Sequence, residues 1–194
     1  CHRLGSIDLR GLTVAIQGLG HVGYYLARHL TTEGARVYGA DVNSANLERA
    51  VTELGVIATE PGEILRLPVD VVAPCAMGAV WHSGSIEELR AGIVCGAANN
   101  QLASEGDGAL LQDRGVLYCP DFLVNAGGII DVHHQRIASP AKVKRAHIGR
   151  IETTLSSVLQ RADEQQRQPQ LIAEELAREY LAHGDRAALL KAAC

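Results

Sequence analysis

Three glycines near the start of the chain have the spacing of a phosphate-binding turn. Gly18, Gly20 and Gly23 lie in the segment GLGHVG, directly after the apolar run LTVAIQ and at the start of a helical pattern. In such a turn the first glycine permits a tight bend, the second lets a pyrophosphate approach the backbone, and the third lets helix and strand pack closely. The free N–H groups and the dipole of the helix favour negative charge there. The segment therefore predicts a dinucleotide site.

An acidic residue at the end of the next strand-like run supports this prediction. Asp41 follows Gly23 by 18 residues, at the end of RVYGAD. A carboxylate there can accept hydrogen bonds from the adenosine ribose and would repel a 2′-phosphate, so NAD is favoured over NADP. Arg36 and Arg49 could accommodate a 2′-phosphate if they turn inward. The alternative is a purely structural glycine turn, with Asp41 as the cap of the next helix.

The elements that must position these residues alternate between strand-like and helical patterns, which is typical of a parallel sheet covered by helices. The strands end in small or polar residues, as expected where strand ends form a ligand crevice. We therefore predict an α/β fold of the Rossmann type, a doubly wound parallel sheet with C-terminal helices. Strands are expected at residues 12–17, 36–41, 69–76, 92–98 and 115–120, and helices at residues 22–33 and 44–54, the latter capped by Asn43.

After Pro140 the pattern is helical only. One amphipathic face precedes the break at Pro169 and a second follows it, with the polar segment RADEQQRQPQ expected as a solvated turn between them. We expect an NAD-binding domain at residues 1–140 and a helical extension packing on it at residues 141–194. The two faces consist of Ile148, Ile151, Leu155, Val158 and Leu159, and of Leu171, Ile172, Leu176 and Tyr180.

Composition narrows the class of protein. The net charge is -4 and the basic residues are scattered, so nucleic-acid binding is not expected. Apolar runs are shorter than the roughly 20 residues of a membrane span, so we expect a cytoplasmic protein with no membrane contact. The cysteines, Cys1, Cys75, Cys95, Cys119 and Cys194, have no disulfide or metal-site spacing. Neighbouring His133 and His134 are expected to be solvated or half-buried, and no metal site is predicted.

Three later motifs narrow the function. APCAMG (residues 73–78), GAANNQL (96–102) and PDFLVNAGGII (120–130) resemble, in order and spacing, the cofactor domain of the glutamate/leucine/phenylalanine/valine dehydrogenases. The leucine dehydrogenase branch is the most similar, and the resemblance covers roughly residues 9–180. It implies oxidative deamination of an L-amino acid to its 2-oxo acid and ammonia, with hydride passing to NAD.

The resemblance also implies roles for single residues. Asn125 would orient the substrate or the nicotinamide, and the paired glycines Gly127 and Gly128 would let the backbone approach the ligand. Ile129 and Val132 match positions that line an apolar substrate pocket, which favours a branched-chain or other apolar amino acid; alternatively, both are ordinary core. The implied cofactor contacts are Gly18, Gly20, His21, Val22, Gly23, Asp41, Val42, Cys75, Ala76, Ala97, Asn99 and Asn125.

Two of these contacts allow a second interpretation. At Cys75 the backbone is expected to matter more than the thiol, because no neighbouring histidine or lysine would lower its pKa. Asn99 matches the position that fixes the carboxamide of the nicotinamide, but with Asn100 it could instead form a turn. Both residues lie in strand-end segments of the predicted sheet.

The catalytic lysines of the family lie in a glycine-rich segment of a preceding substrate domain. No such segment occurs here, and the only lysines, Lys142, Lys144 and Lys191, are expected to be surface charges. We therefore expect this chain alone to bind NAD with little or no turnover, and the intact enzyme to be a homo-oligomer. The absence of a starting methionine favours this hypothesis over a free-standing NAD-binding module with a sensing or partner-binding role.

Overall fold

The chain forms two compact units, residues 1–121 and residues 122–194. The structure, a computed structural model, describes residues 8–182. Cys1, Lys191 and Cys194 lie outside the described residues. The predicted boundary at residue 140 falls inside the second unit.

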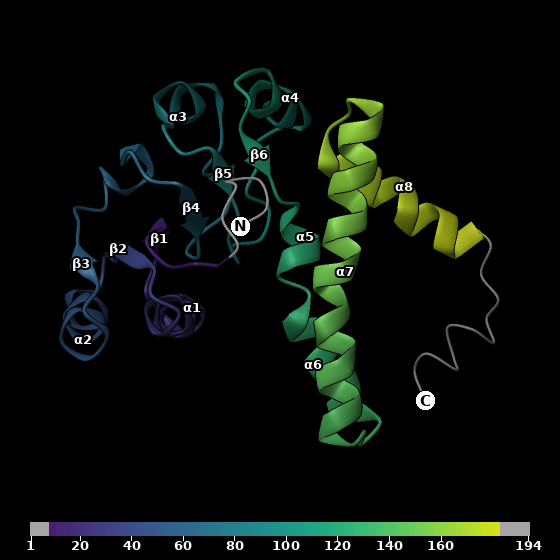
Figure 1. Ribbon diagram of the computed structural model, residues 1–194, viewed down its shortest axis with the longest axis horizontal. Helices are drawn as coiled ribbons and strands as arrows, with labels where there is room; N and C mark the ends of the chain where they lie inside the picture. Colours follow the sequence, from purple (N-terminus) through teal and green to yellow (C-terminus); the bar gives the residue numbers. More distant parts are fainter. Residues whose placement is uncertain (1–7, 183–194) are drawn as a thin grey trace. The chain divides into compact units, whose positions relative to one another are not determined.

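The first unit is built on a parallel sheet of six strands (Figure 1). Their order is β3-β2-β1-β4-β5-β6, and every neighbouring pair runs parallel. This is the doubly wound order, which confirms the predicted Rossmann-type α/β fold and places a crevice where the order reverses, beside the carboxyl ends of β1 and β4. The strands are β1 Thr13–Gln17, β2 Arg36–Ala40, β3 Ile57–Ala58, β4 Val71–Pro74, β5 Ile93–Val94 and β6 Leu117–Tyr118.

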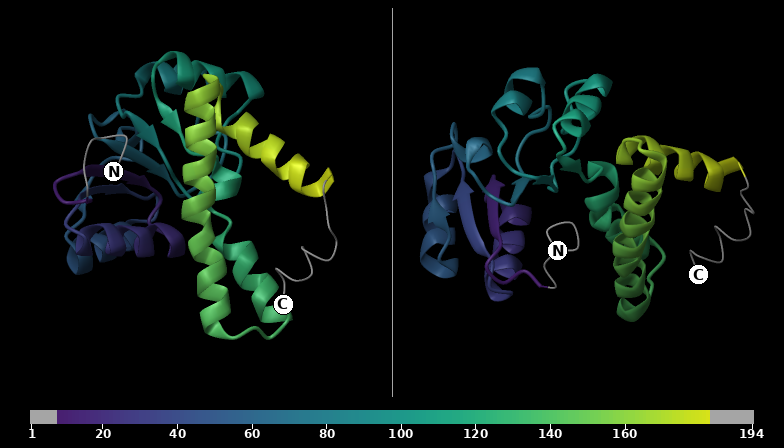
Figure 2. Two further views of the ribbon diagram at one scale, coloured as in Figure 1. Left: turned by 45° about the vertical axis from the view of Figure 1, so that its right-hand side comes forward. Right: turned by 45° about the horizontal axis from the view of Figure 1, so that its top comes forward.

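Helices cover both faces of this sheet, as the views in Figure 2 show. The side chains of β1 alternate between two cores: Val14 and Ile16 pack with residues of α1 and α2, whereas Ala15 packs with residues of α3 and α4. Trp81 is fully buried in the second of these cores. The helices of this unit are α1 His21–Thr32, α2 Ser44–Leu54, the 3₁₀ helix η2 Ile64–Arg66, α3 Ser83–Glu88 and α4 Glu105–Asp113.

The helix boundaries follow local capping chemistry. The bounds of α2 are those predicted, and the side chain of Asn43 accepts a hydrogen bond from the N–H of Ala45, as expected of its cap. Helix α4 begins with a capping box, in which Ser104 and Asp107 satisfy each other's backbone N–H groups. Strands β4, β5 and β6 are shorter than predicted at both ends.

The second unit is helical. It contains α6 Gly127–Arg136, α7 Ala141–Gln165 and α8 Pro169–Ala182, and α5 Asp121–Val124 leads into it. Buried Val158 and Ala162 of α7 pack with Ile172 and Ala173 of α8. The predicted faces hold only in part, because Leu171 and Tyr180 of the second face are exposed. The predicted solvated turn at residues 161–170 is wrong in its first half, because α7 continues to Gln165. The chain reverses at residues 166–168, and Pro169 begins α8, where its missing N–H costs no helical hydrogen bond.

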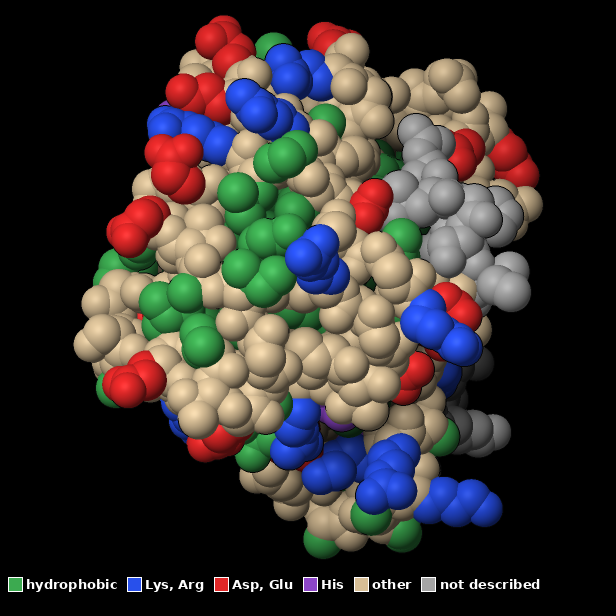
Figure 3. Space-filling model, turned by 60° about the vertical axis from the view of Figure 1, so that its left-hand side comes forward, with side chains coloured by type: hydrophobic (Ala, Val, Ile, Leu, Met, Phe, Trp, Pro, Cys, Tyr) green, Lys and Arg blue, Asp and Glu red, His purple; other side chains and the backbone are tan. Residues whose placement is uncertain are grey.

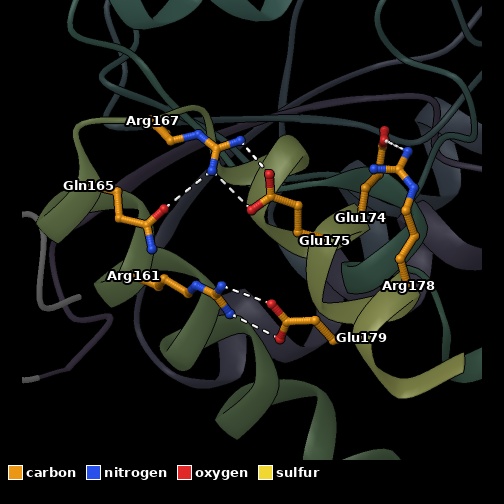
Figure 4. A network of polar contacts seen from close by, with 7 residues as sticks. All are labelled: Arg161, Gln165, Arg167, Glu174, Glu175, Arg178 and Glu179. Carbon is orange, nitrogen blue, oxygen red and sulfur yellow. Dashed lines mark hydrogen bonds and ion pairs between the residues drawn. The ribbon is translucent and has the colours of Figure 1, made fainter. Parts of the chain in front are cut away.

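Ion pairs connect α7 and the turn after it to α8 (Figure 4). Arg161 binds Glu179 through two hydrogen bonds, at 3.3 and 2.9 Å. Arg167 binds Glu175 in the same bidentate manner, and this bond lowers the pKa of the Glu175 carboxyl. On α8 the two acceptors, Glu175 and Glu179, lie about one helical turn apart, so both pairs hold the same stretch of α8.

The surface carries both signs of charge. Acidic and basic side chains occur together on the face drawn in Figure 3, with small groups of apolar side chains between them. Among residues 8–182, no helix is long and apolar enough to cross a membrane.

Candidate functional site

A pocket of about 250 Å³ opens at the carboxyl ends of β1, β2 and β4. The structure thus brings together six of the predicted cofactor contacts, Gly18, Gly20, Asp41, Val42, Cys75 and Ala76, from three separate stretches of sequence. Gln17, Ala40 and Pro61 complete the lining and were not predicted. Position at the switch point of a doubly wound sheet makes this pocket the natural site for a nucleotide.

Each glycine of the turn has a different structural reason. Gly18 has a φ of +93°, and a Cβ there would lie 2.9 Å from the Cβ of Ala76. At Gly23 a Cβ would lie 1.9 Å from the carbonyl oxygen of Gly18, so only glycine lets α1 pack this closely on the turn. At Gly20 a Cβ would meet nothing within 4 Å. The first and third glycines are therefore required by the fold, whereas the second is not.

The amino end of α1 opens beside Gly20. This residue is the N-cap of α1 and makes no side-chain cap, and the first turn of the helix carries no acidic residue. By helix geometry, the N–H groups of the first turn, including those of His21 and Val22, have no carbonyl partner inside α1. Both side chains are exposed. An unblocked, unneutralised helix N-terminus above an open glycine is suited to an anion such as a pyrophosphate.

Asp41 connects the glycine turn to the end of β2. Its carboxylate accepts hydrogen bonds from the N–H of Leu19 at 2.7 Å and from the N–H of Asn43 at 2.8 Å. The cap of α2 is Asn43, so Asp41 is not itself the helix cap. A carboxylate has about four lone-pair positions, and the side-chain amide of Asn46 at 3.3 Å uses a third. Asp41 lines the pocket with capacity for a ligand hydroxyl.

The two arginines that could have accepted a 2′-phosphate are placed elsewhere. Arg36 is the first residue of β2, at the opposite end of the strand from Asp41. The guanidinium of Arg49 lies 3.8 Å from the ring centroid of Tyr24 and 3.3 Å from a carboxylate oxygen of Glu53. Neither arginine lines the pocket.

Gln17 is a pocket residue with an unused acceptor. Its Oε1 is buried and has no hydrogen-bond partner within the described part of the chain. A buried polar atom without a partner is costly and is usually satisfied by water or a ligand. Gln17 is the last residue of β1, and a polar residue at the end of a buried strand was the only sequence signal for it.

The thiol of Cys75 is not activated. Burial raises its pKa, and this effect exceeds the lowering caused by a hydrogen bond from the Ala97 backbone. The thiol therefore stays protonated near neutral pH, which agrees with a backbone rather than a nucleophilic role. The same hydrogen bond brings Cys75 and Ala97 together at neighbouring strand ends.

The segment after β5 is fastened to the segment after β4. The N–H of Ala98 donates to the carbonyl of Pro74 at 2.9 Å, and the N–H of Ala79 donates to the carbonyl of Asn100 at 2.6 Å. Asn100 has a φ of +51°, a backbone conformation that is typical of turns. The turn suggested as an alternative for Asn99 and Asn100 is therefore present at Asn100. Asn99 is exposed.

Gln101 binds the backbone of this segment through its side chain, a role that the sequence did not predict. Its side chain is fully buried, and its amide nitrogen donates to the carbonyls of Gly96 at 2.8 Å and Ala98 at 3.0 Å. Its own N–H donates to the buried carboxylate of Asp121 at 2.7 Å. The backbone around Ala97 is therefore rigidly positioned.

The predicted substrate residues belong to the second unit. Asn125 is half-buried between α5 and α6, so a helix break separates it from Ile129 and Val132, which lie on one face of α6. These two side chains are 73% and 55% exposed, which is more than ordinary core residues would be. They line a pocket of about 520 Å³ together with His133, Arg136 and Ile137.

Lys142, Lys144 and His134 of this unit were expected to be surface charges or a solvated or half-buried side chain. Lys142 is exposed, and Lys144, whose side chain is 32% exposed, forms an ion pair with Asp131 at 2.5 Å. His134 is buried, contrary to expectation, and its Nε2 lies 2.9 Å from Nδ1 of His147. Within residues 8–182, no group of three histidine, cysteine or acidic side chains could hold a metal ion.

Comparison with known proteins gives a consistent result. The family model described as glutamate/leucine/phenylalanine/valine dehydrogenase matches residues 40–183. A leucine dehydrogenase of Bacillus cereus is 35% identical over 178 residues, which cover 92% of this chain and 49% of that enzyme. The crystal structure of L-tryptophan dehydrogenase from Nostoc punctiforme superimposes with a TM-score of 0.90 at 36% identity and covers 94% of this chain and 56% of that one.

A more distant structure shares the same fold. The hetero-hexameric glutamate dehydrogenase from Thermus thermophilus, in its leucine-bound form, has a TM-score of 0.72 at 26% identity, covering 96% of this chain and 50% of its own. The chain thus spans about half the length of each of these relatives.

Proposed function

The chain belongs to the glutamate/leucine/phenylalanine/valine dehydrogenase family, and from this premise we propose that it is the NAD-binding part of an L-amino-acid dehydrogenase. The reaction is oxidative deamination of an apolar, branched-chain amino acid to its 2-oxo acid and ammonia. The observation that carries the cofactor assignment is the pocket at the switch point of the sheet, which gathers the open glycine, the helix N-terminus and Asp41.

The residues present fit NAD. Gly20 leaves free space for a pyrophosphate, and the exposed amino end of α1 offers N–H groups to it. The unpartnered Oε1 of Gln17 and the carboxylate of Asp41 are acceptors for hydroxyl groups. Arg36 and Arg49, the two residues considered for a 2′-phosphate, do not line the pocket, which supports NAD over NADP.

When bound, NAD would supply the nicotinamide that accepts a hydride from the α-carbon of the amino acid. The residues of this chain would bind the cofactor and orient the nicotinamide and the substrate. Ala97 and Asn99 would present backbone and amide groups to the nicotinamide, in a segment that Gln101 keeps fixed. Asn125, by its match to the family motif, would orient the substrate or the ring.

The substrate class rests on α6. Ile129 and Val132 offer apolar side chains to a pocket instead of being enclosed in the core. Desolvating an apolar side chain against them favours binding by roughly 25 cal/mol per Å². This supports a branched-chain or similarly apolar amino acid, by analogy with the leucine dehydrogenase of Bacillus cereus.

The same proposal has two further parts. The only lysines of the described chain are exposed Lys142 and ion-paired Lys144, neither of which is poised to act as a general base, so residues 1–194 on their own should show little turnover. The intact enzyme would be a homo-oligomer; hexameric assembly of the Thermus thermophilus glutamate dehydrogenase supports an oligomeric state.

Calorimetric titration tests the cofactor assignment. NADH should bind saturably and at least about tenfold more tightly than NADPH. Replacing Asp41→Asn should weaken NADH binding and narrow the difference, because it removes the charge that excludes a 2′-phosphate. Asp113→Asn, the same change at an exposed position outside the pocket, is the matched control and should change neither affinity.

Two results would reject this proposal. If neither nucleotide bound, the glycine turn would be structural only. If NADPH bound as tightly as NADH, the role given to Asp41 would be wrong.

A further inference from the structure

Two cysteines face each other at the carboxyl ends of β5 and β6. The strands pair in parallel with Ile93 opposite Leu117 and Val94 opposite Tyr118, so the next residues, Cys95 and Cys119, are also opposite. The N–H of Cys119 donates to the carbonyl of Val94 at 2.9 Å, which continues the pairing to this point. Side chains of opposite residues in neighbouring strands leave the same face of the sheet.

The two thiols are in contact and differ in character. They share a hydrogen bond, which lowers the pKa of Cys95 and raises that of Cys119, with burial adding to the rise at Cys119. Cys95 is half-buried, whereas Cys119 is only 5% exposed. The pair therefore combines a half-buried cysteine with a lowered thiol pKa and an enclosed cysteine with a raised one.

We propose that Cys95 and Cys119 form a redox-modification site, in which a peroxide converts the two thiols into an intrachain disulfide. Neighbouring strands lie about 4.8 Å apart, inside the Cα separation of about 4.4–6.8 Å that a disulfide spans. The two residues are therefore close enough to be linked while their strands stay paired.

The reaction balances with the peroxide as the only oxidant. The Cys95 thiolate attacks one peroxide oxygen, the O–O bond breaks, and the leaving oxygen takes up a proton to become water. Cys95 is then a sulfenic acid, oxidised by two electrons. The Cys119 sulfur attacks the Cys95 sulfur, the S–O bond breaks, and hydroxide leaves as water with the proton of the Cys119 thiol. Two thiols and one peroxide thus yield one disulfide and two waters.

The disulfide should be reducible and should disturb the adjacent loop. The Cβ atoms of opposite residues in a parallel pair lie roughly as far apart as the strands, farther than the mean of about 3.8 Å in disulfides. Bond formation therefore draws the two strand ends together. Cys95 directly precedes Gly96, which is packed so closely that a Cβ there would lie 2.3 Å from the carbonyl oxygen of Pro74. Movement of Cys95 should therefore displace Gly96 and the following segment, which includes Ala97 and Asn99.

Coupling to the cofactor rests on the proposed function. If residues 96–99 face the nicotinamide, the disulfide should weaken NADH binding about tenfold, and bound NADH should disfavour the disulfide by the same factor, because linkage is reciprocal. The site itself does not depend on this coupling, so the two can be tested apart.

Peptide mapping tests the site directly. The full chain is treated with hydrogen peroxide, its free thiols are blocked with N-ethylmaleimide, and it is digested with trypsin. Cleavage after Arg66, Arg90, Arg114 and Arg136 puts Cys75, Cys95 and Cys119 on three separate peptides, residues 67–90, 91–114 and 115–136. We expect peptides 91–114 and 115–136 to be joined, and dithiothreitol to separate them.

Variants distinguish this pairing from general oxidation. Cys119→Ala should abolish the joined peptides and leave Cys95 as a sulfenic or over-oxidised species, while Cys75→Ser should leave the Cys95–Cys119 link intact. A link from Cys95 to Cys75, or no link while Cys95 is oxidised, would overturn the proposal.

The coupling has its own readout, calorimetric NADH titration of the reduced and oxidised chain. Tenfold weaker binding after oxidation, reversed by dithiothreitol, is the expected result. Equal affinity in a chain shown to carry the link would overturn the coupling. No NADH binding even when reduced, with the link still forming, would reject the proposed function and leave the redox site standing.

Discussion

The glycines of the GLGHVG turn allow the roles of fold and ligand to be separated experimentally. Gly23→Ala places a Cβ 1.9 Å from the carbonyl oxygen of Gly18, and this oxygen belongs to the backbone, which cannot rotate away. The first turn of α1 must then move off the glycine turn. Overpacking of a close contact costs about 1–3 kcal/mol and more where backbone must shift, so we expect a loss of at least about 3 kcal/mol in the free energy of unfolding.

Gly20→Ala should leave the free energy of unfolding nearly unchanged but weaken NADH binding. Gly20 has a φ of -63°, and its Cβ would meet nothing within 4 Å, so the only cost to the fold is that alanine is a poorer N-cap than glycine. That cost is below about 1 kcal/mol. The added methyl group stands where the pyrophosphate must approach the backbone, so NADH affinity should fall at least about tenfold, or by about 1.4 kcal/mol.

The assay is a pair of measurements on each variant: urea unfolding followed by circular dichroism, and NADH binding by calorimetry. Gly62→Ala is the matched control, since this exposed loop glycine also has nothing within 4 Å of a Cβ and does not line the pocket. Unchanged NADH affinity in Gly20→Ala would refute the phosphate role of the second glycine. An unfolding free energy of Gly23→Ala equal to that of the parent would refute the packing argument.

Three further changes test other parts of the structure. Asp70 accepts hydrogen bonds from the hydroxyl and N–H of Thr13, both at 2.7 Å, which lower its pKa. Its stabilisation should be present above the unfolded-state pKa of about 4 and lost as pH falls through the lower folded pKa, so urea unfolding of Asp70→Asn should show a smaller loss on acidification than the parent. Gly149→Ala, within α7 and free of steric conflict, should stabilise the chain by about 1 kcal/mol in thermal unfolding, and no gain would contradict the helical assignment there. Gln101→Leu leaves the carbonyls of Gly96 and Ala98 without their donor and should cost about 2–4 kcal/mol in urea unfolding, whereas a neutral result would show that water replaces the amide.

Sequence reasoning succeeded where local chemistry decides structure. The α2 helix was predicted to its ends because Asn43 caps it and Gly55, at a φ of +69°, terminates it. The order of strands and helices along the chain was sufficient to predict a doubly wound sheet. The glycine turn was also predicted correctly, because the glycines that its backbone requires lie within six consecutive residues.

Elements without a local signal were missed. Both residues of β3, Ile57 and Ala58, are exposed, so no burial pattern marks the strand. Helix α4 was missed for a different reason, because Gly106 and Gly108 weaken its helical pattern. Ser104 followed by Asp107 is a capping-box signal from which it could have been predicted.

The unpredicted site residues depend on tertiary contacts. Pro61 reaches the pocket only because β3 pairs at the edge of β2. Gln101 acts on carbonyls of a loop that is itself shaped by hydrogen bonds to the segment after β4. Such roles follow from which strands are neighbours in the sheet, and sequence spacing does not encode them directly.

The burial of Trp81 gives the two units separate spectroscopic signatures. It is the only tryptophan of the chain, and it lies fully enclosed in the sheet unit, so its emission should be blue-shifted when that unit is folded and red-shifted when it opens. The 25 residues of α7 and 14 residues of α8 contribute a large part of the far-ultraviolet dichroism instead. Denaturant midpoints that coincide in both signals mean that the units unfold as one cooperative block; separated midpoints mean that the helical unit and the sheet unit have independent stabilities.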